Sequence, residues 1–462
     1  MTQELITISP IDGREVVRRA YANEAQIAQA LAQAQSAQVA WHTLGVAERG
    51  RIVSAAVDRF VAAKDEIARA ITIQMGRPLR YTPGEVAGFE ARARHMISIA
   101  DVALAPLRMP EQAGFTRFVS REPIGVALTI APWNYPLLTA VNSIVPALMA
   151  GNTVILKHSD QTPLCAELME RAFRDAGVPK GVFQTLHANH DTVQRLIRAP
   201  EIGYVSFTGS VRGGRIVEES AAGRFIGVGL ELGGNDPAYV RADAKLDHAV
   251  ETLVDGAFFN SGQSCCGIQR IYVARARYDE FVERAVELTN GYVLGNPLHA
   301  DTTLGPVVRT RAAAEIREVV AEALSAGAQN MIDPSHFNNA SEGSPYVAPA
   351  LLTRVNHRMR IMNDECFGPV VGIMPVDTDE AAVALMNDSP YGLTAAVFTQ
   401  DEDAALALGR QVRTGTFFMN RCDYLDPALA WTGVKNTGRG VSLSAIGYEQ
   451  LTQAKSFHLR SV

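Results

Sequence analysis

Two short segments of this chain carry residue types that together can perform covalent chemistry on a carbonyl group. Cys265 lies in the small-residue segment 262–266 (GQSCC), and Glu231 precedes a pair of glycines in segment 231–234 (ELGG). A thiolate can attack a carbonyl carbon, and a carboxylate can activate the water that later releases the acyl group. Sequence order alone does not bring the two side chains together, so the elements that position them decide whether they form a site.

A third candidate, Asn134, lies in segment 131–136 (APWNYP), directly after an apolar and β-branched stretch. Its side-chain amide can donate an N–H to the negative charge that develops on a carbonyl oxygen during nucleophilic attack. The competing interpretation is a turn asparagine between two prolines. For Cys265 and Glu231, the competing interpretations are a buried packing cysteine and an ordinary surface glutamate.

The elements expected around these residues alternate between strands and helices, which is typical of a parallel sheet with helices on both faces. The first hundred residues are expected to be helical, with helices at 23–40 and 47–75. Strands then follow at 125–130, 153–156, 182–186 and 204–207, separated by helices that reach about 150, 162–176 and 192–198. A second block adds helices at 246–259, 278–289 and 309–326 and strands at 269–273, 370–376, 393–398 and 416–419. The predicted fold class is therefore α/β, and such sheets bind ligands beyond the carboxyl ends of their strands.

The composition fits a globular protein and argues against several kinds of partner. The 462 residues suggest two or three domains, and a net charge of −6 gives no electrostatic reason to expect nucleic acid or an anionic membrane. No apolar run has the length of a membrane span, and the first ten residues lack the pattern of a secretory signal. Five cysteines do not make a disulfide framework in a chain of this length, so we expect thiols in a reducing cytoplasm. Cys165, Cys366 and Cys422 are expected to be buried packing residues.

Taken in order along nearly the whole chain, these motifs resemble the aldehyde dehydrogenase superfamily. Segment 258–265 (FFNSGQSC) closely matches the nucleophile signature of that family. The resemblance implies that Cys265 is the nucleophile and that Glu231 is the general base for deacylation. It also implies that the side chain of Asn134 and the backbone N–H of Cys265 hold the oxyanion.

The resemblance further implies an NAD(P) cofactor at the carboxyl ends of the first strands. The corresponding segments are 157–160 (KHSD), 207–210 (FTGS) and 365–369 (ECFGP). Hydroxyls and free N–H groups before a helix suit a pyrophosphate, and an acidic residue at the ribose disfavours a 2′-phosphate. We therefore expect NAD, with NADP as the alternative. The cofactor contacts implied in this way are Trp133, Lys157, Ser159, Asp160, Thr208, Gly209, Ser210, Leu232, Glu365 and Phe367.

The chain also departs from the family pattern at several places. His158 and Asp160 stand where the family usually has proline and glutamate, and segment 186–191 lacks the usual Gly-x-Gly. Ser143 and Gly440 occupy the positions of a lysine and a glutamate that can relay a proton from the base. His158 and the missing glycine pair resemble the branch that contains some succinate-semialdehyde dehydrogenases. No second His or Cys lies at ligand spacing from His158, so no metal site is predicted.

The residues that would line the substrate pocket by motif position are mainly apolar and aromatic. They are Tyr135, Leu138, Thr139, Ser264, Cys266, Arg421, Leu425 and Trp431. This set suits an aromatic or medium aliphatic aldehyde. The alternative is a semialdehyde whose distal carboxylate binds Arg421, and against it stands a surface or structural role for that arginine. Cys266 is expected to pack in the pocket, and the alternative is a redox role through a vicinal disulfide with Cys265, which would be strained.

The resemblance implies three structural units. An NAD(P)-binding domain is predicted at residues 1–103 and 124–232, and a catalytic domain at 233–440. Residues 104–123 and 441–462 would form an arm that joins subunits in a homodimer or homotetramer.

Three other functions compete with a hydrolytic aldehyde dehydrogenase. A CoA-acylating relative needs no base to activate water, so Glu231 argues against it. An unrelated cysteine hydrolase would have no use for the cofactor motifs. A catalytically silent protein of the same fold would be favoured by the loss of Cys265 or Glu231, and both are present.

Overall fold

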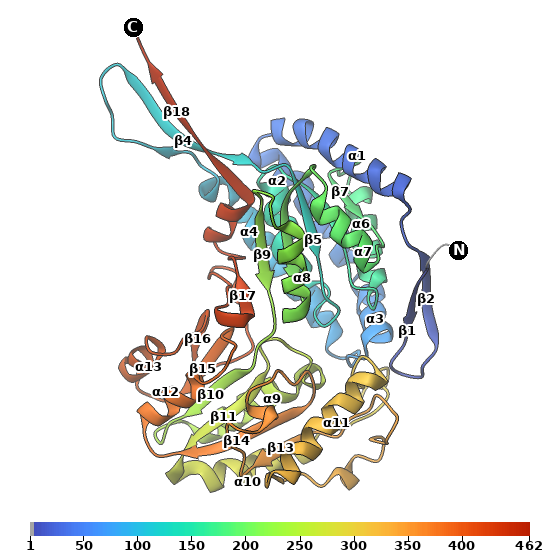
Figure 1. Cartoon of the computed structure of the whole chain (residues 1–462), viewed down its shortest axis with the longest axis vertical. Helices are drawn as coiled ribbons and strands as arrows, with labels where there is room; N and C mark the ends of the chain where they lie inside the picture. Colours follow the sequence, from blue (N-terminus) through green and yellow to red (C-terminus); the bar gives the residue numbers. More distant parts are fainter. Residues whose placement is uncertain (1–3) are drawn as a thin grey trace.

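The chain forms two α/β units, one above the other in Figure 1, and a thin β arm that projects from one end. The computed structural model describes residues 4–462, so Met1 to Gln3, which belong to the segment expected to lack a secretory signal, lie outside the described residues. The helices are α1 (Glu24–Thr43), α2 (Val46–Ala62), α3 (Lys64–Met75), α4 (Thr82–Ala103), α5 (Leu138–Met149), α6 (Pro163–Asp175), α7 (His190–Arg198), α8 (Val211–Ala221), α9 (Leu246–Phe258), α10 (Tyr278–Asn290), α11 (Thr310–Ser325), α12 (Asp379–Asn387) and α13 (Glu402–Gly409).

The upper unit is built on a six-stranded sheet. Its order is β17-β9-β8-β5-β6-β7, and all neighbours are parallel except β17 with β9. The strands are β5 (Val126–Ile130), β6 (Thr153–Lys157), β7 (Phe183–Thr185), β8 (Ile202–Thr208), β9 (Gly227–Glu231) and β17 (Gly438–Arg439). The predicted domain boundaries place 438–439 in the catalytic domain, but these residues pair with the other sheet.

Helices cover both faces of this sheet because the residues of its strands are apolar on both sides. In β5, Val126 and Leu128 pack in one core with residues of α1, α7 and α8. Ala127 between them packs in a second core with residues of α2 to α6. Successive side chains of a strand point to opposite faces, so a strand buried on both faces reads as a continuous apolar run.

The lower unit is built on a seven-stranded sheet of order β12-β13-β14-β11-β10-β15-β16, with β12 as its antiparallel edge. Its strands are β10 (Asp236–Val240), β11 (Ile268–Ala274), β12 (Gln329–Asn330), β13 (Ala350–Thr353), β14 (Val370–Val376), β15 (Thr394–Phe398) and β16 (Thr416–Met419). The predicted α/β class and the predicted alternation of strands and helices in both units agree with this architecture.

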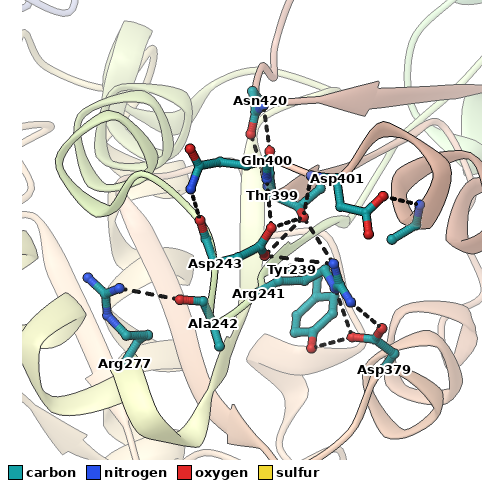
Figure 2. A network of polar contacts seen from close by, with 11 residues as sticks. Tyr239, Arg241, Ala242, Asp243, Arg277, Asp379, Thr399, Gln400, Asp401 and Asn420 are labelled. Atoms are coloured by element: carbon teal, nitrogen blue, oxygen red, sulfur yellow. Dashed lines mark hydrogen bonds and ion pairs between the residues drawn. The ribbon is translucent and has the colours of Figure 1, made fainter.

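A polar network fixes the end of this sheet from which the loop after β16 departs (Figure 2). Arg241, just after β10, pairs with Asp379 at the start of α12 at 3.0 Å. Asn420 accepts a bond from the N–H of Thr399 at 3.0 Å and donates to its carbonyl at 2.8 Å. The Thr399 hydroxyl donates to Asp243 at 2.7 Å. The network therefore anchors the start of the loop that follows Asn420.

The arm is a three-stranded antiparallel sheet of order β18-β4-β3, with the carboxyl terminus at its tip (Figure 1). Its strands are β3 (Leu107–Arg108), β4 (Phe115–Pro123) and β18 (Thr452–Arg460). The rings of Phe118 and Phe457 stack across β4 and β18 with centroids 4.6 Å apart. The two segments predicted to form an arm, 104–123 and 441–462, thus contribute strands that pair with each other.

The first hundred residues differ from the all-helical expectation at their start. A two-stranded hairpin of β1 (Glu4–Ile8) and β2 (Glu15–Ala20) precedes the helices, with Gly13 at φ +74° in its turn. Asn23, the first residue of the predicted helix 23–40, caps α1 with both bonds of a capping box. The predicted helix 47–75 is divided at Ala63 into α2 and α3, and it ends at Gly76 as expected. No helix of residues 4–462 is long and apolar enough to cross a membrane.

Candidate active site

A cavity of about 460 Å³ lies between the two units, and both Glu231 and Cys265 line it. Glu231 is the last residue of β9, and Cys265 lies in the loop between α9 and β11. The structure thus brings together the carboxylate and the thiol that the sequence motifs suggested as partners. Cavities that hold convergent polar groups in a mainly apolar lining are the usual form of small-molecule sites.

The glycines of the two motifs allow this close approach. A Cβ added at Gly234 would overlap the backbone carbonyl of Cys265, and one added at Gly233 would overlap the carboxylate of Glu365. Gly262 has φ +70° and lies against the backbone of Gly368. Each of these positions has no room for a side chain, which explains why both motifs are rich in glycine.

The loop that carries Cys265 is held by hydrogen bonds from buried side chains. Asn260 and Ser261 have φ of 54° and 56°, in the left-handed region. The Ser261 hydroxyl donates to the Gly305 carbonyl at 2.8 Å, and the Gln263 amide oxygen accepts from the N–H of Val308 at 2.8 Å. These bonds fix the backbone on the amino-terminal side of the thiol.

Asn134 reaches this loop from the other unit. Its side-chain nitrogen donates to the carbonyl of Gln263 at 3.2 Å, two residues before Cys265. The amide group carries two hydrogens, so the second is available to an oxygen bound beside the thiol. The backbone carbonyl of Asn134 accepts hydrogen bonds from Arg77 and from the Asn260 side chain.

Arg77 and Glu85, which the sequence analysis did not single out, hold the Asn134 loop in place. Both side chains are buried and form an ion pair. Glu85 also accepts from the backbone N–H of Leu137 at 2.8 Å, and Arg77 donates to the Asn260 side chain at 3.0 Å. The Arg77 guanidinium lies 4.5 Å from the ring centroid of Tyr135. One buried pair therefore connects the Asn134 loop to the Cys265 loop.

Glu231 is surrounded by groups that act on its charge in opposite directions. Burial raises the pKa of Glu231, whereas the Ser442 hydroxyl, the positive charge of Arg92 and the Thr208 hydroxyl all lower it. Ser442 donates to one carboxylate oxygen, and Thr208 lies 3.4 Å from the other. A second cavity of about 20 Å³, which Glu231 and Ser442 line together with Ser143, has room for one water molecule.

The Cys266 thiol contacts both Cys265 and the side chain of Asp423. Its thiol donates to Asp423 at 2.9 Å, and the Ser264 hydroxyl donates to the same oxygen at 3.2 Å. Burial raises the pKa of Asp423 to about 6. All five cysteines are free thiols, and Cys165, Cys366 and Cys422 are buried as predicted.

The first group of residues expected to bind the cofactor lies at the carboxyl ends of strands in the six-stranded sheet. Trp133 follows β5, Lys157 ends β6 and Thr208 ends β8, three neighbouring parallel strands. Ser210 caps α8 by accepting from the N–H of Gly213. A cation, hydroxyls and a helix amino terminus at these strand ends fit the ribose and phosphate groups of a dinucleotide.

The second group of predicted cofactor residues belongs to the lower unit and contacts the carboxyl ends of these strands. The Glu365 carboxylate accepts from the N–H of Gly234 at 2.9 Å, and burial raises the pKa of Glu365 to about 7. The ring of Phe367 packs edge-on against Trp133, with centroids 5.7 Å apart. The remaining predicted contacts on this path are Ser159, Asp160, Gly209 and Leu232, and Leu232 also lines the large cavity.

Residues 1–457 match the family model of the aldehyde dehydrogenase family. The chain belongs to the aldehyde dehydrogenase family. A succinate-semialdehyde dehydrogenase (NADP+) of Deinococcus radiodurans is 35% identical, over 97% of this chain and 93% of its own length. A 3,6-anhydro-alpha-L-galactose dehydrogenase of Streptomyces coelicolor is 34% identical, over 99% of this chain and 93% of its own. The solved structure of PnpE in complex with nicotinamide adenine dinucleotide superposes with a TM-score of 0.94 at 30% identity, covering 99% of this chain and 94% of that one.

These relatives confirm the predicted fold and the predicted class of enzyme, an NAD(P)-dependent aldehyde oxidoreductase.

Two departures of this aldehyde dehydrogenase from the family pattern have a structural reason. His158 is buried between Pro136, whose carbonyl lies 2.9 Å from one ring nitrogen, and Thr162, at 3.1 Å from the other. Burial lowers the pKa of His158 to about 4, so the neutral ring ties β6 to the Asn134 loop. In segment 186–191, Asn189 caps α7 and His187 bonds Glu167 at 3.0 Å. Within residues 4–462, no group of three or more His, Cys, Asp or Glu side chains is arranged to hold a metal ion.

Six of the eight predicted pocket residues line the large cavity of this aldehyde dehydrogenase. They are Tyr135, Leu138, Thr139, Cys266, Leu425 and Trp431. The other two do not line it. Ser264 is buried, with its hydroxyl 3.5 Å from the sulfur of Cys266. Arg421 is exposed, with its guanidinium 3.3 Å from the ring centroid of Tyr424. The structure does not bring Arg421 to the cavity lining. Sequence reasoning missed Arg92, Asp255 and Asp423, which do line it.

Proposed function

We propose that this aldehyde dehydrogenase oxidises an aldehyde to the carboxylic acid with NAD(P), by a hydrolytic and CoA-independent route through a thioester on Cys265. The observation that carries the proposal is the shared cavity of Cys265 and Glu231, with the Asn134 amide beside the Cys265 loop. Nucleophile, base and oxyanion donor are the three parts that acyl-enzyme chemistry requires.

In the first half of the proposed reaction, the Cys265 sulfur adds to the aldehyde carbon and forms a thiohemiacetal. The oxygen of the former carbonyl then accepts hydrogen bonds from the Asn134 side chain and the backbone N–H of Cys265. NAD(P), which Trp133, Lys157, Thr208 and Glu365 would help to hold, would supply the acceptor for the hydride of that carbon. Loss of this hydride from the carbon and of the proton from its oxygen leaves a thioester on Cys265.

In the second half, Glu231 removes a proton from a water molecule that attacks the thioester carbon. The carbon–sulfur bond breaks, the acid leaves, and Cys265 is restored. Because burial raises the pKa of Glu231, its carboxylate is a stronger base than an exposed one. The proton then leaves Glu231 through Ser442 and water in the small cavity, since Ser143 and Gly440 stand in place of the relay residues.

We infer that NAD is preferred, with NADP as the alternative. Asp160 lies at the predicted ribose edge, where its charge disfavours a 2′-phosphate. Lys157 at 3.0 Å and Tyr21 at 2.7 Å from its two carboxylate oxygens partly offset that charge. The comparison proteins themselves use both, because the PnpE structure holds NAD and the Deinococcus enzyme is named for NADP+.

We also infer a homodimer or homotetramer in which the arm joins subunits, and a reducing cytoplasm as the compartment. The projecting arm and its paired strands support the first inference. The five free thiols support the second.

The test follows reduced cofactor at 340 nm with a panel of aldehydes, with and without CoA. Turnover without CoA is expected for the wild type, and none for Cys265→Ala, which should still bind cofactor. Glu231→Gln should give a burst of reduced cofactor followed by slow turnover, because deacylation loses its base. Undiminished activity in Cys265→Ala would overturn the proposal, and strict dependence on CoA would favour the acylating relative.

A further inference from the structure

One buried cation in the large cavity is not used by the proposed mechanism. Arg92, on α4, is 8% exposed and lines the same cavity as Cys265 and Glu231. Lys and Arg are rarely buried unless they are paired. No carboxylate of residues 4–462 forms an ion pair with Arg92.

The hydrogen bonds of Arg92 leave part of its guanidinium free. One terminal nitrogen donates to the Leu138 carbonyl at 2.8 Å and to the Asn142 side chain at 3.2 Å, both on α5. Within the described residues, no partner is found for the other terminal nitrogen or for the nitrogen next to the chain, although an arginine carries five N–H donors. The two hydrogen bonds of one terminal nitrogen fix the orientation of the guanidinium. The N–H groups of the other two nitrogens are available to a ligand in the cavity.

The titratable groups that act on Arg92 belong to the reaction centre. They are Cys266, Glu231, Glu85 and Cys265, and burial lowers the pKa of Arg92 against the effect of these groups, which in their ionised forms would raise it. Glu85 already pairs with Arg77, and Glu231 receives the Ser442 hydroxyl. None of these four groups forms a hydrogen bond or an ion pair with Arg92.

The face of α4 that carries Arg92 borders the cavity at three positions. Gly84, Gly88 and Arg92 follow one another at intervals of four residues and all line the cavity. A Cβ added at Gly84 would meet no atom within 4 Å. A Cβ added at Gly88 would lie 2.8 Å from the side chain of Leu138, so Leu138, which also lines the cavity, covers this face between Gly84 and Arg92.

We propose that Arg92 binds a carboxylate at the far end of the substrate, so that the preferred substrates are aldehydes bearing a carboxylate. The inference rests on the proposed oxidation at Cys265 and names its substrate class. A planar guanidinium with free donors matches a carboxylate in charge and geometry, and its desolvation in the cavity strengthens the interaction. Arg421 is exposed and stacked on Tyr424, so it does not compete for this role from within the cavity.

The test compares kcat/KM for pairs of aldehydes with equal chain length, one with a terminal carboxylate and one without. Succinate semialdehyde is paired with butanal, and glutarate semialdehyde with pentanal. The wild type should favour the carboxylate-bearing member of at least one pair. Because the charge of Arg92 also lowers the pKa of Glu231, Arg92→Met can change kcat/KM for both members of a pair, so the test is their ratio. Arg92→Met should lower the ratio of kcat/KM for the carboxylate-bearing member to kcat/KM for its uncharged partner about 10- to 100-fold. Arg92→Lys should lie between, because it keeps the charge and loses the fork of donors.

Two variants serve as controls. Arg94→Met lies on the same helix, where Arg94 is paired at the surface with Asp58 and Glu90, and it should leave the selectivity unchanged. Arg421→Met separates the two arginines, because loss of selectivity in this variant and not in Arg92→Met would overturn the proposal. A thermal melt of each variant checks that it is folded.

A direct binding measurement is independent of turnover. Calorimetric titration with succinate should show binding to the wild type and at least about 10-fold weaker binding to Arg92→Met. Equal losses of kcat/KM for charged and uncharged aldehydes in Arg92→Met, with a displaced pH profile, would show that Arg92 acts on Glu231 or Cys265 and would overturn the carboxylate site. Failure of the wild type to oxidise any aldehyde would instead refute the proposed function.

Discussion

The backbone at Gly234 lies directly against the backbone carbonyl of Cys265, so that a methyl group at Gly234 would overlap that oxygen. Gly234 belongs to the motif of the proposed base, Glu231, and Cys265 is the proposed nucleophile. Gly234→Ala is expected to move the Cys265 loop away from Glu231. Because small displacements of reacting groups cost about 100-fold in rate, kcat should fall by about that factor. Overpacking should also lower the free energy of unfolding by about 1–3 kcal/mol.

The matched control for this variant is Gly45→Ala. A Cβ at Gly45 would meet no atom within 4 Å, and its φ of −62° is open to any residue. Steady-state rates and denaturant unfolding of the two variants should therefore differ clearly. Wild-type activity in Gly234→Ala would show that the Cys265 loop tolerates displacement.

Asn134 and Arg77 should contribute to the same step in different ways. Asn134→Ala removes the proposed oxyanion donor and is expected to lower kcat by about 100- to 1000-fold. Arg77→Lys keeps a charge for Glu85 but loses donors to the Asn134 carbonyl and the Asn260 side chain. It should lower kcat by about 10-fold through misplacement of the Asn134 loop.

The measurement is kcat together with KM for the cofactor, which neither variant should change. Arg80→Lys, at an exposed position three residues further on, is the control for Arg77→Lys. A raised KM for the cofactor with an unchanged kcat would contradict the positioning role of Arg77.

The parts of the site that the sequence could reveal are those carried by short contiguous motifs. Glu231, Asn134 and Cys265 each stand in a segment whose composition is specific, and the structure brings these segments to one place. The alternation of apolar strands and helices similarly predicted both sheets. These signals are local, so they can be recognised without knowledge of the tertiary contacts.

The parts that the sequence could not reveal depend on contacts between distant segments. Ser442 reaches Glu231, and Asp423 reaches Cys266, through loops whose course follows from packing and not from pattern. The hairpin of β1 and β2 was missed because its strands are only 5 and 6 residues long. For Arg92 a weak signal existed, since Gly84, Gly88 and Arg92 recur at helical spacing, but such spacing does not show what the face contacts.

Ser442 should set the acid limb of the pH profile. Its hydroxyl bonds the Glu231 carboxylate and lowers the pKa of Glu231 against the larger effect of burial. Ser442→Ala removes this bond, so the pKa of Glu231 rises further. Because Glu231 must be ionised to accept a proton from water, the acid limb of kcat should move to higher pH.

The profile of kcat against pH, measured where deacylation limits turnover, checks this prediction. Ser444→Ala, two residues away, is the control, since its hydroxyl bonds the N–H of Ile446 and not Glu231. An acid limb that moves to lower pH in Ser442→Ala would contradict the assigned effect of the hydroxyl.

Asp423 should make stability depend on pH in a defined window. Burial raises the pKa of Asp423 from 3.8 to about 6, so the folded state binds a proton more tightly than the unfolded chain does. The stabilisation from this group is therefore complete below about pH 4 and is lost as the pH rises through 6. Since each pKa unit corresponds to about 1.4 kcal/mol, the loss amounts to about 3 kcal/mol.

Asp423→Asn removes this titration while keeping a side chain of similar size. The free energy of unfolding of the wild type, measured relative to that of Asp423→Asn by denaturant titration, should fall by about 3 kcal/mol between pH 4 and pH 7. Asp101→Asn, at an exposed position of α4, should show no such change relative to the wild type. A difference that stays constant across this window would mean that Asp423 does not hold its proton in the folded protein. In that case, the hydrogen bonds from the Cys266 thiol and the Ser264 hydroxyl would offset the free-energy cost of burying an ionised Asp423 carboxylate.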